Sequence, residues 1–113
     1  MFSKNDSVET LLGPGTRFSG SMATKGTLKL YGSVEGDIEA DWLITAEGSA
    51  VSGSVTAGGI IIGGTVEGNL TARERVEIKH KGSVRGYIRT ARLAVEDGAR
   101  LWGRISMSEG EKG

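Results

Sequence analysis

The residues best suited to acid–base or nucleophilic chemistry are few in this chain. His80 is the only histidine, and Lys79 and Lys81 stand on either side of it. A catalytic histidine needs a partner that orients its ring and a reacting group within hydrogen-bonding distance. The neighbouring cations supply neither, so we interpret His80 as a corner or surface residue. The chain has no cysteine, which excludes disulfides and thiolate metal sites and is typical of a reducing cytoplasm.

Four carboxylates alternate with other residues between positions 35 and 41. Side chains two residues apart share one face of a strand, so this series could loosely collect cations. It lacks the converging geometry of a calcium or magnesium site, and we expect a solvated strip instead. The four residues are Glu35, Asp37, Glu39 and Asp41.

Glycine pairs offer the only resemblance to a phosphate-binding loop. Gly58-Gly59 and Gly63-Gly64 flank Ile60-Ile61-Ile62. Neither pair is followed by Gly-Lys-Ser/Thr, the sequence whose backbone and lysine hold phosphates in nucleotide-binding loops. We therefore expect no nucleotide, no other cofactor and no enzyme activity.

The densest run of charge places seven cations between positions 73 and 92. One interpretation is a basic face for anionic lipid, a polyanion or a protein partner. The other is an ordinary solvated surface, because outward positions of strands must be polar. Tyr87 is the only aromatic residue among these cations, so we do not expect specific nucleic-acid recognition, which needs bases stacked on several rings. The cations are Arg73, Arg75, Lys79, Lys81, Arg85, Arg89 and Arg92.

The elements that carry these side chains follow from a repeated pattern, Gly-x-Val-x-Gly-x-Ile with small variations, which occurs six times. An apolar residue stands two positions before and two positions after each central glycine, the spacing of a strand with one buried face. A repeat of nearly fixed length predicts a stack of equivalent units, which is a solenoid. The central glycines, 15 to 18 residues apart, are Gly20, Gly36, Gly53, Gly68, Gly86 and Gly103.

A second apolar pair follows each of the first five glycines. About 17 extended residues at roughly 3.3 Å each give a perimeter near 55 Å, which fits a triangular coil of three short strands stacked at about 4.8 Å. The central glycine is expected to face inward, where the three sides of the coil converge, and to adopt the unusual dihedral angles of a corner. The second pairs are Leu28/Leu30, Trp42/Ile44, Ile60/Ile62, Val76/Ile78 and Leu93/Val95.

Composition agrees with a thin apolar core in a single domain. Glycine accounts for 19 of 113 residues, and aromatic residues for only 5%. No apolar run reaches the roughly 18 residues that cross a bilayer, and no signal peptide is visible. We expect flexible tails at 1–14 and 108–113 around a folded region at 15–107, in a cytoplasmic protein.

Residues 17–107 resemble the bactofilins, a family of bacterial cytoskeletal proteins. The resemblance rests on Gly-Ser-Val-Glu-Gly-Asp-Ile at 32–38 and its variants at 64–70 and 82–88. It implies an all-β fold, a single-stranded right-handed β-helix of about six triangular coils with disordered N- and C-terminal tails. It also implies polymerisation without nucleotide into filaments at the inner face of the cytoplasmic membrane. Such filaments support cell shape or polar organisation and recruit cell-wall-modifying enzymes.

The two ends of a β-helix expose unpaired backbone groups and apolar side chains, and uncapped ends associate. We therefore expect end-to-end self-assembly, with folded-back tails as the alternative. Residues 1–56 carry four basic and seven acidic side chains, whereas residues 57–113 carry ten and seven. Opposite charges favour head-to-tail joints, but the resemblance implies like-to-like joints, and we follow it because surface charges are screened. The candidate polymer interface comprises Phe18, Met22, Leu93, Val95, Leu101, Trp102 and Ile105.

The N-terminal segment is a candidate membrane anchor. Its start, Met1-Phe2-Ser3-Lys4, resembles the short membrane-attaching start of some bactofilins. One aromatic ring with a nearby cation suits the headgroup boundary of a bilayer. The alternative is a leader that keeps filaments soluble. The candidate membrane-binding residues are Met1, Phe2, Lys4, Leu11 and Leu12.

Two other classes of protein remain as alternatives. A left-handed β-helix acyltransferase needs a strict six-residue repeat, yet stepping by six from Val34 reaches Ala40, Ala46 and Ser52. A surface-binding solenoid, such as an ice-binding protein, needs outward Thr-x-Thr rows, which the sequence lacks. A filament scaffold agrees best with the pattern.

Overall fold

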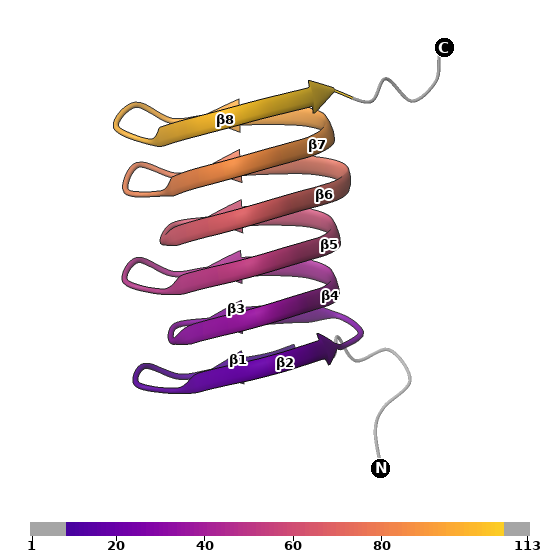
Figure 1. Cartoon of the computed structure of the whole chain (residues 1–113), viewed down its shortest axis with the longest axis vertical. Helices are drawn as coiled ribbons and strands as arrows, with labels where there is room; N and C mark the ends of the chain where they lie inside the picture. The colour runs from indigo at the N-terminus through magenta and orange to yellow at the C-terminus, as the bar shows by residue number, and fades with distance from the viewer. Residues whose placement is uncertain (1–8, 108–113) are drawn as a thin grey trace.

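The computed structural model describes residues 9–107, and every regular element in this range is a β-strand. Figure 1 shows the strands wound about one axis, so that the chain rises from the N-terminus to the C-terminus as a right-handed solenoid. All strand pairs are parallel. The strands are β1 (Glu9–Leu12), β2 (Arg17–Ala23), β3 (Thr27–Leu30), β4 (Ser33–Thr45), β5 (Ala50–Ile62), β6 (Thr65–Ile78), β7 (Ser83–Val95) and β8 (Arg100–Met107).

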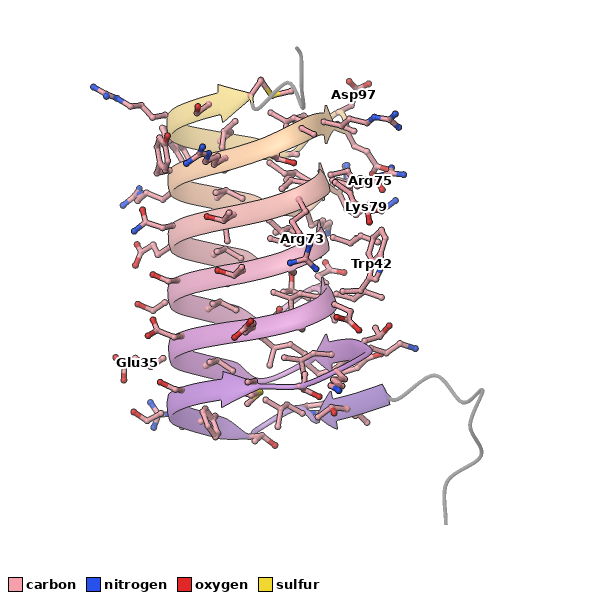
Figure 2. The ribbon with its side chains drawn as sticks, turned by 90° about the vertical axis from the view of Figure 1, so that its right-hand side faces the viewer. Glu35, Trp42, Arg73, Arg75, Lys79 and Asp97 are labelled. Atoms are coloured by element: carbon pink, nitrogen blue, oxygen red, sulfur yellow. The ribbon has the colours of Figure 1, made fainter. Side chains whose placement is uncertain are left out.

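Each of the four middle coils is one long strand, β4 to β7, whereas the first coil is divided between β2 and β3. In β4 we call residues 33–36, which end at a glycine of positive φ, the first side, residues 37–41 the second side and residues 42–45, which pair with β3, the third side. Figure 2 shows Glu35 at one bend and Trp42 on the opposite side of the solenoid. Hydrogen bonds to the neighbouring coils continue around the bends, which explains why one strand of 13 or 14 residues replaces the several short strands expected.

The coils are aligned so that equivalent side chains lie above one another in ladders. Val34, Val51, Val66 and Val84 form one inward ladder and are at most 2% exposed. The predicted period-two pattern is therefore confirmed on the first two sides. Such ladders form a narrow, continuous apolar core along the solenoid axis, which is the main stabilising feature of a fold without helices.

The prediction that Trp42 and Ile44 point inward on the third side of the second coil is wrong. Leu43 and Thr45 point inward there and are 0% and 2% exposed. Ala23 and Thr27 are four positions apart in the first coil, whereas the aligned residues Glu39 and Trp42 are three positions apart. This difference of one residue reverses the side of the strand that each following residue faces. The Thr45 hydroxyl accepts a hydrogen bond from the Gly63 amide at 3.1 Å, so the buried polar group is satisfied.

The solenoid begins earlier than expected. Residues 9–12, assigned to the flexible tail, form β1, which pairs with β3, the third side of the first coil, and so belongs to a partial coil that precedes β2. Leu12 packs against the core, whereas Leu11 points outward and is 60% exposed. Adjacent residues of a strand face opposite sides, so Leu11 and Leu12 have different environments. The tail residues Met1, Phe2 and Lys4 lie outside the described range.

The central glycines adopt the unusual corner conformation expected from the sequence, and they also allow close packing between coils. Gly68 has a φ of 132°, a conformation that side chains other than glycine rarely adopt. A Cβ on Gly68 would overlap the carbonyl oxygen of Gly53 in the preceding coil. The glycine ladder therefore allows close approach of successive coils along the axis, in addition to turning the chain.

Candidate polymerisation surfaces

The N-terminal end of the solenoid is an open edge. Within residues 9–107, β1 pairs only with β3 and β2 only with β4, so each leaves one side of its backbone without a partner strand. Phe18 and Met22 begin the inward ladders of this end and are half-buried against the core. Unpaired strand edges beside apolar side chains form a template for another β-structure.

The C-terminal end of the described range is open in the same way, because β8 pairs only with β7 there. Ile105 lies in the same inward ladder as Ile88, yet Ile105 is 40% exposed and Ile88 is 0% exposed. Val95 ends another inward ladder and is 48% exposed. Leu93 and Leu101 are half-buried against the core. This end therefore exposes the cross-section of the core.

Sequence reasoning left Met107 out of the candidate interface. Met107 aligns with Thr90 in β7 and is 48% exposed at the open end. Its signal was present in the sequence, because a large apolar residue stands four positions after Gly103, where most repeats have alanine or threonine. We add Met107 to the C-terminal surface.

Trp102 differs from the other candidate interface residues because it points outward. It aligns with Arg85, which lies on the outer surface of β7. The guanidinium carbon of Arg85 is 5.3 Å from the centroid of the indole ring, within the range of a cation–π contact. Trp102 therefore borders the C-terminal surface and is not part of the exposed core cross-section.

The seven cations between positions 73 and 92 do not form one face. Figure 2 shows Arg73, Arg75 and Lys79 on the side of the solenoid opposite Glu35. Arg85, in contrast, belongs to the outward ladder of Glu35, and Arg89 lies on the second side of its coil. Lys81 lies in the turn before β7, and Arg92 aligns with Arg75. Residues 73–92 cover more than one coil, so their side chains lie around the whole perimeter of the solenoid.

Several of these cations are paired with carboxylates. Glu77 contacts Arg75 and Lys79 at 2.9 Å each, and Lys79 also contacts Glu96 at 3.4 Å. The hydrogen bond from Lys79 lowers the pKa of Glu77, and the same bond raises the pKa of Lys79. Lys81 contacts Glu47 at 3.3 Å. The positive charge that Arg75, Lys79 and Lys81 could offer to a polyanion is therefore smaller than the sequence indicates.

His80 and Asp41, which the sequence offered as candidates for catalysis and for cation binding, make hydrogen bonds within the solenoid. His80 lies in a turn, where its Nδ1 is 2.9 Å from the carbonyl oxygen of Asp97 and its backbone amide donates to Glu96. Asp41 accepts a hydrogen bond from the Gly26 amide at 2.8 Å. Across residues 9–107, no cluster of three or more histidines and carboxylates is arranged to hold a metal ion.

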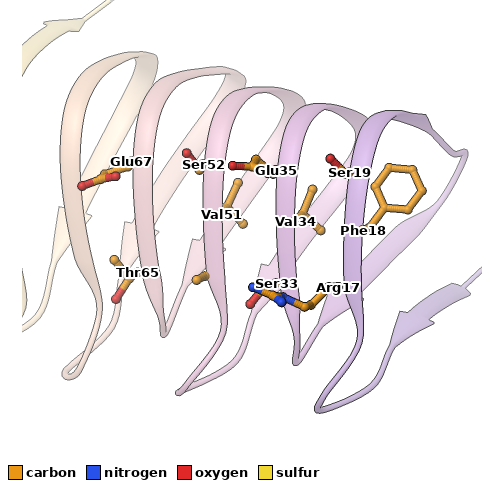
Figure 3. A pocket seen from close by; sticks show the side chains of 11 residues that line it. Arg17, Phe18, Ser19, Ser33, Val34, Glu35, Val51, Ser52, Thr65 and Glu67 are labelled. Atoms are coloured by element: carbon orange, nitrogen blue, oxygen red, sulfur yellow. The ribbon is translucent and has the colours of Figure 1, made fainter.

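A shallow hollow runs along the first side of the N-terminal coils. Figure 3 shows small polar side chains on its floor, including Ser19 and Ser52, with Phe18 at its end. Glu35 and Glu67 lie on the same outward ladder of this side, without a histidine or lysine beside them. In the described part of the chain, no helix is long and apolar enough to cross a bilayer.

Comparisons with known proteins agree with this geometry. A family model described as "Bactofilin: Polymer-forming cytoskeletal" matches residues 10–106. Bactofilin BacP of Myxococcus xanthus (strain DK1622) is 34% identical over 105 residues, covering 92% of this chain and 44% of BacP. Bactofilin BacO of the same organism is 30% identical over 104 residues, covering 91% of this chain and 82% of BacO. The chain thus spans less than half the length of BacP.

A solved structure has the same fold. A cryo-EM reconstruction of Thermus thermophilus bactofilin double helical filaments matches with a TM-score of 0.81 and 32% sequence identity, covering 88% of this chain and 99% of that chain. A right-handed β-solenoid that shares this fold and matches a polymer-forming family is a cytoskeletal filament protein. The chain belongs to the bactofilin family.

Proposed function

We propose that this chain assembles end to end, without nucleotide, into membrane-associated filaments that support cell shape or polar organisation in the cytoplasm. The observation that carries the proposal is the contrast along single inward ladders. Ile88 is 0% exposed, whereas Ile105 in the same ladder is 40% exposed because no further coil covers it within residues 9–107. A second molecule placed on this end would bury Ile105 as the solenoid buries Ile88.

The energetics favour such a joint. Complete burial of an aliphatic side chain contributes about 1.5–3 kcal/mol, and Val95, Ile105 and Met107 are each 40–48% exposed. The open edge of β8 adds backbone hydrogen bonds, as strand addition does elsewhere. In residues 9–107 nothing covers either end of the solenoid. Stacking thus removes from water the same apolar groups that a cap would cover.

The joint needs no nucleotide in this proposal. The glycine pair at 58–59 lies within β5, and the pair at 63–64 connects β5 to β6. A Cβ on Gly59 would overlap the ring of Trp42, and one on Gly64 would overlap Ser49. Both glycines are therefore explained by close packing between coils, and stacking of apolar surfaces provides the driving force for assembly.

Membrane association would come from the N-terminal tail, with Met1, Phe2 and Lys4 as contacts. Of the two leucines proposed as membrane contacts, we keep only Leu11, because Leu11 is exposed in β1 and Leu12 packs against the core. Burying one phenylalanine contributes about 1.5–3 kcal/mol, which is weak for an isolated chain. A filament displays one tail per subunit, and such linked contacts bind far more tightly than one contact. Cell-wall-modifying enzymes and other partners would then bind the lateral sides of the filament.

The polarity of the filament follows from which ends join. We propose like-to-like joints, in which two C-terminal ends meet and two N-terminal ends meet. Leu93, Leu101 and Ile105 present an apolar surface that can face its own copy, whereas the charges that favour head-to-tail joints are screened. Such a filament has no overall direction.

Electron microscopy of the purified full chain tests the proposal. We expect filaments to form in buffer alone, with the same length distribution after addition of ATP, GTP or Mg²⁺. Filaments that require a nucleotide, or a chain that stays monomeric at high concentration, would overturn the proposed function. A protein that binds an acyl donor or a crystal surface without polymerising would instead fit one of the alternative classes.

A further inference from the structure

One coil carries an extra residue at the corner between the second and third sides. Between two aligned pairs of residues, β5 has only Gly58, whereas β6 has Arg73 and Glu74. At the same corner β7 has only Ala91. Two residues opposed to one form a β-bulge, which re-aims side chains and is common beside functional sites. The bulge of β6 places Arg73 and Glu74 on the outer surface, where both are exposed.

The bulge borders a shallow hollow on the outer surface, which we call the bulge site. Its volume is about 460 Å³, within the range of small-ligand pockets, so it suits a few side chains of a partner. Figure 2 shows Trp42, Arg73 and Arg75 on this side of the solenoid. The bulge site is lined by Trp42, Arg73, Glu74, Arg75, Ala91 and Arg92.

Two consecutive buried glycines, Gly58 and Gly59, make room for the side chains of the bulge site. A Cβ on Gly59 would overlap the six-membered ring of Trp42. A Cβ on Gly58 would lie 3.3 Å from Nη2 of Arg73. An indole ring and a guanidinium group therefore lie over the same glycine pair. Tryptophan and arginine are also the residue types that contribute most to binding at protein interfaces.

The lining of the bulge site has an excess of positive charge, with three arginines and one glutamate. Arg75 donates a hydrogen bond to Glu77 at 2.9 Å. Arg73 and Arg92 are exposed, and neither guanidinium takes part in an ion pair within residues 9–107. Guanidinium groups bind carboxylates through two parallel hydrogen bonds. The unpaired arginines are therefore complementary to carboxylates of another molecule.

We propose that the bulge site binds an acidic peptide segment of a partner protein. Carboxylates of the segment contact Arg73 and Arg92, and an apolar side chain between them packs against the indole ring of Trp42. The inference deepens the proposed function, because it rests on the proposal that partners bind the lateral sides of the filament and assigns that contact to named residues.

Carboxylates of the chain favour a peptide over a continuous polyanion. Glu74 lines the bulge site, and Glu77 lies beside it through its hydrogen bond to Arg75. Nucleic acid carries a phosphate at short, regular intervals, so its charges would face these glutamates as well as the arginines, and opposed like charges weaken binding. A peptide can place carboxylates at two positions and a neutral group opposite Glu74.

The centre of the bulge site stays accessible in the proposed filament. Trp42 in β4 and Arg73 in β6 lie in coils that have a neighbouring coil on each side. Arg92 borders the C-terminal surface, because it precedes Leu93 on the last third side within residues 9–107. A filament repeats the bulge site once per subunit, so a partner with several acidic segments binds more tightly than one segment alone.

A synthetic peptide, acetyl-Glu-Glu-Leu-Glu-Glu-amide with a fluorescent label, serves as the probe. We expect its fluorescence anisotropy to rise on addition of the full chain. The neutral peptide with glutamine in place of glutamate should bind about tenfold more weakly, since two ion pairs are lost. The peptide should also change the tryptophan emission of Trp102→Phe, in which Trp42 remains, and leave that of Trp42→Phe unchanged.

Substitutions in the bulge site test the assigned contacts. Arg73→Gln should weaken peptide binding about threefold, and Arg73→Gln/Arg92→Gln about tenfold. Trp42→Ala should weaken binding, whereas Trp42→Phe should retain most of it because an aromatic ring remains. The matched control is Arg89→Gln, which removes the same charge at an exposed position on the second side. It should leave the affinity unchanged.

Several results would overturn the proposal. They are no binding of the acidic peptide, equal binding of the neutral peptide, unchanged affinity in Arg73→Gln/Arg92→Gln, and an equal loss in Arg89→Gln. Polyphosphate that binds more tightly than a peptide of the same charge, and loses affinity in the double variant, would assign the bulge site to a polyanion instead. Separation of laterally paired filaments in the double variant, with full peptide affinity, would assign it to a second copy of the chain.

The proposed function and this inference fail in different ways. Peptide binding does not require assembly, so a chain that binds the peptide and forms no filaments would contradict only the end-to-end function. A chain that forms filaments and does not bind the peptide would overturn only the role of the bulge site.

Discussion

Val84 and Leu101 lie in register across β7 and β8, in the same inward ladder, but in different environments. Val84 is 0% exposed because a coil covers it on each side, whereas Leu101 has a neighbour on one side only and is half-buried. Within residues 9–107, the difference between the two residues is therefore one covering coil. In the proposed filament, a second molecule supplies it.

Leu101→Arg should shorten filaments to small oligomers. The substitution places a charge on the stacking surface, and burial of an unpaired charge costs several kcal/mol. Circular dichroism should stay β-rich because Leu101 lies at an end of the core. Electron microscopy and light scattering measure the effect. The matched control is Leu11→Arg, at an outward position that is 60% exposed, which should leave filament length unchanged.

The size of the Leu101→Arg oligomer also reports filament polarity. Like-to-like joints leave the N-terminal ends functional, so dimers should accumulate. Head-to-tail joints would leave monomers, because each joint then needs one C-terminal end. Leu101→Arg filaments of normal length would remove this end from the interface.

Gly68→Ala should destabilise the solenoid more than Gly48→Ala. Both glycines have positive φ, 132° and 93°, and such a conformation costs about 1–3 kcal/mol for other residues. A Cβ on Gly68 would also overlap the Gly53 carbonyl oxygen, whereas one on Gly48 has no heavy atom within 4 Å. Urea unfolding of the two variants measures the difference. Equal losses of stability would contradict the role assigned to the glycine ladder.

Glu77→Gln should reduce stability at pH 7 and have little effect at pH 3. The hydrogen bond from Lys79 holds the pKa of Glu77 below its ordinary value, so its contribution is present above the unfolded pKa and is lost as the pH falls through the folded pKa. Lys79 has a raised pKa, and its contribution is lost only as the pH rises through that value. Unfolding midpoints at both pH values test the sign.

A suitable control for this pH dependence is Glu47→Gln. The pair of Glu47 with Lys81 is more exposed, with side chains 67% and 61% accessible, and exposed pairs contribute little. We expect nearly the same midpoint as the unmodified protein. A Glu77→Gln deficit that stays constant between pH 7 and pH 3 would mean that packing, and not charge, explains its effect.

Deletion of residues 2–8 should release filaments from anionic vesicles without shortening them. This deletion stops before β1, which begins at Glu9, so this strand stays complete. Phe2→Ser should act in the same direction, and Phe2→Trp should retain binding because tryptophan suits the membrane interface. Co-sedimentation with phosphatidylglycerol vesicles measures binding. If the deleted chain sediments equally well, the cations from Arg73 to Arg92 become the better candidate anchor.

The sequence predicted the solenoid and its inward ladders because the pattern around each glycine is regular. The third side of the coils was harder to predict. Trp42, Leu43 and Ile44 are three consecutive apolar residues, so periodicity alone cannot tell which of them point inward. The length of the preceding bend decides this, and it varies by one residue between coils.

The boundary at β1 and the alignment of charged residues far apart in the sequence were not predictable in the same way. β1 has four residues and no pattern glycine, and its adjacent leucines give no alternation. Glu39 and Arg89 are 50 positions apart in the sequence, and their shared ladder appears only when the register of four strands is known. Variable turns between coils hide that register from a count of residues.

Cryo-EM of filaments from the full chain tests end-to-end stacking most directly. The glycine ladder counts six coils, which at about 4.8 Å each predicts an average axial rise near 29 Å per subunit. The reconstruction should show coils stacked at this spacing along the filament axis, with Leu101 and Ile105 buried at the joint. Coils that lie across the filament axis, or terminal surfaces left open to solvent in the filament, would contradict the account.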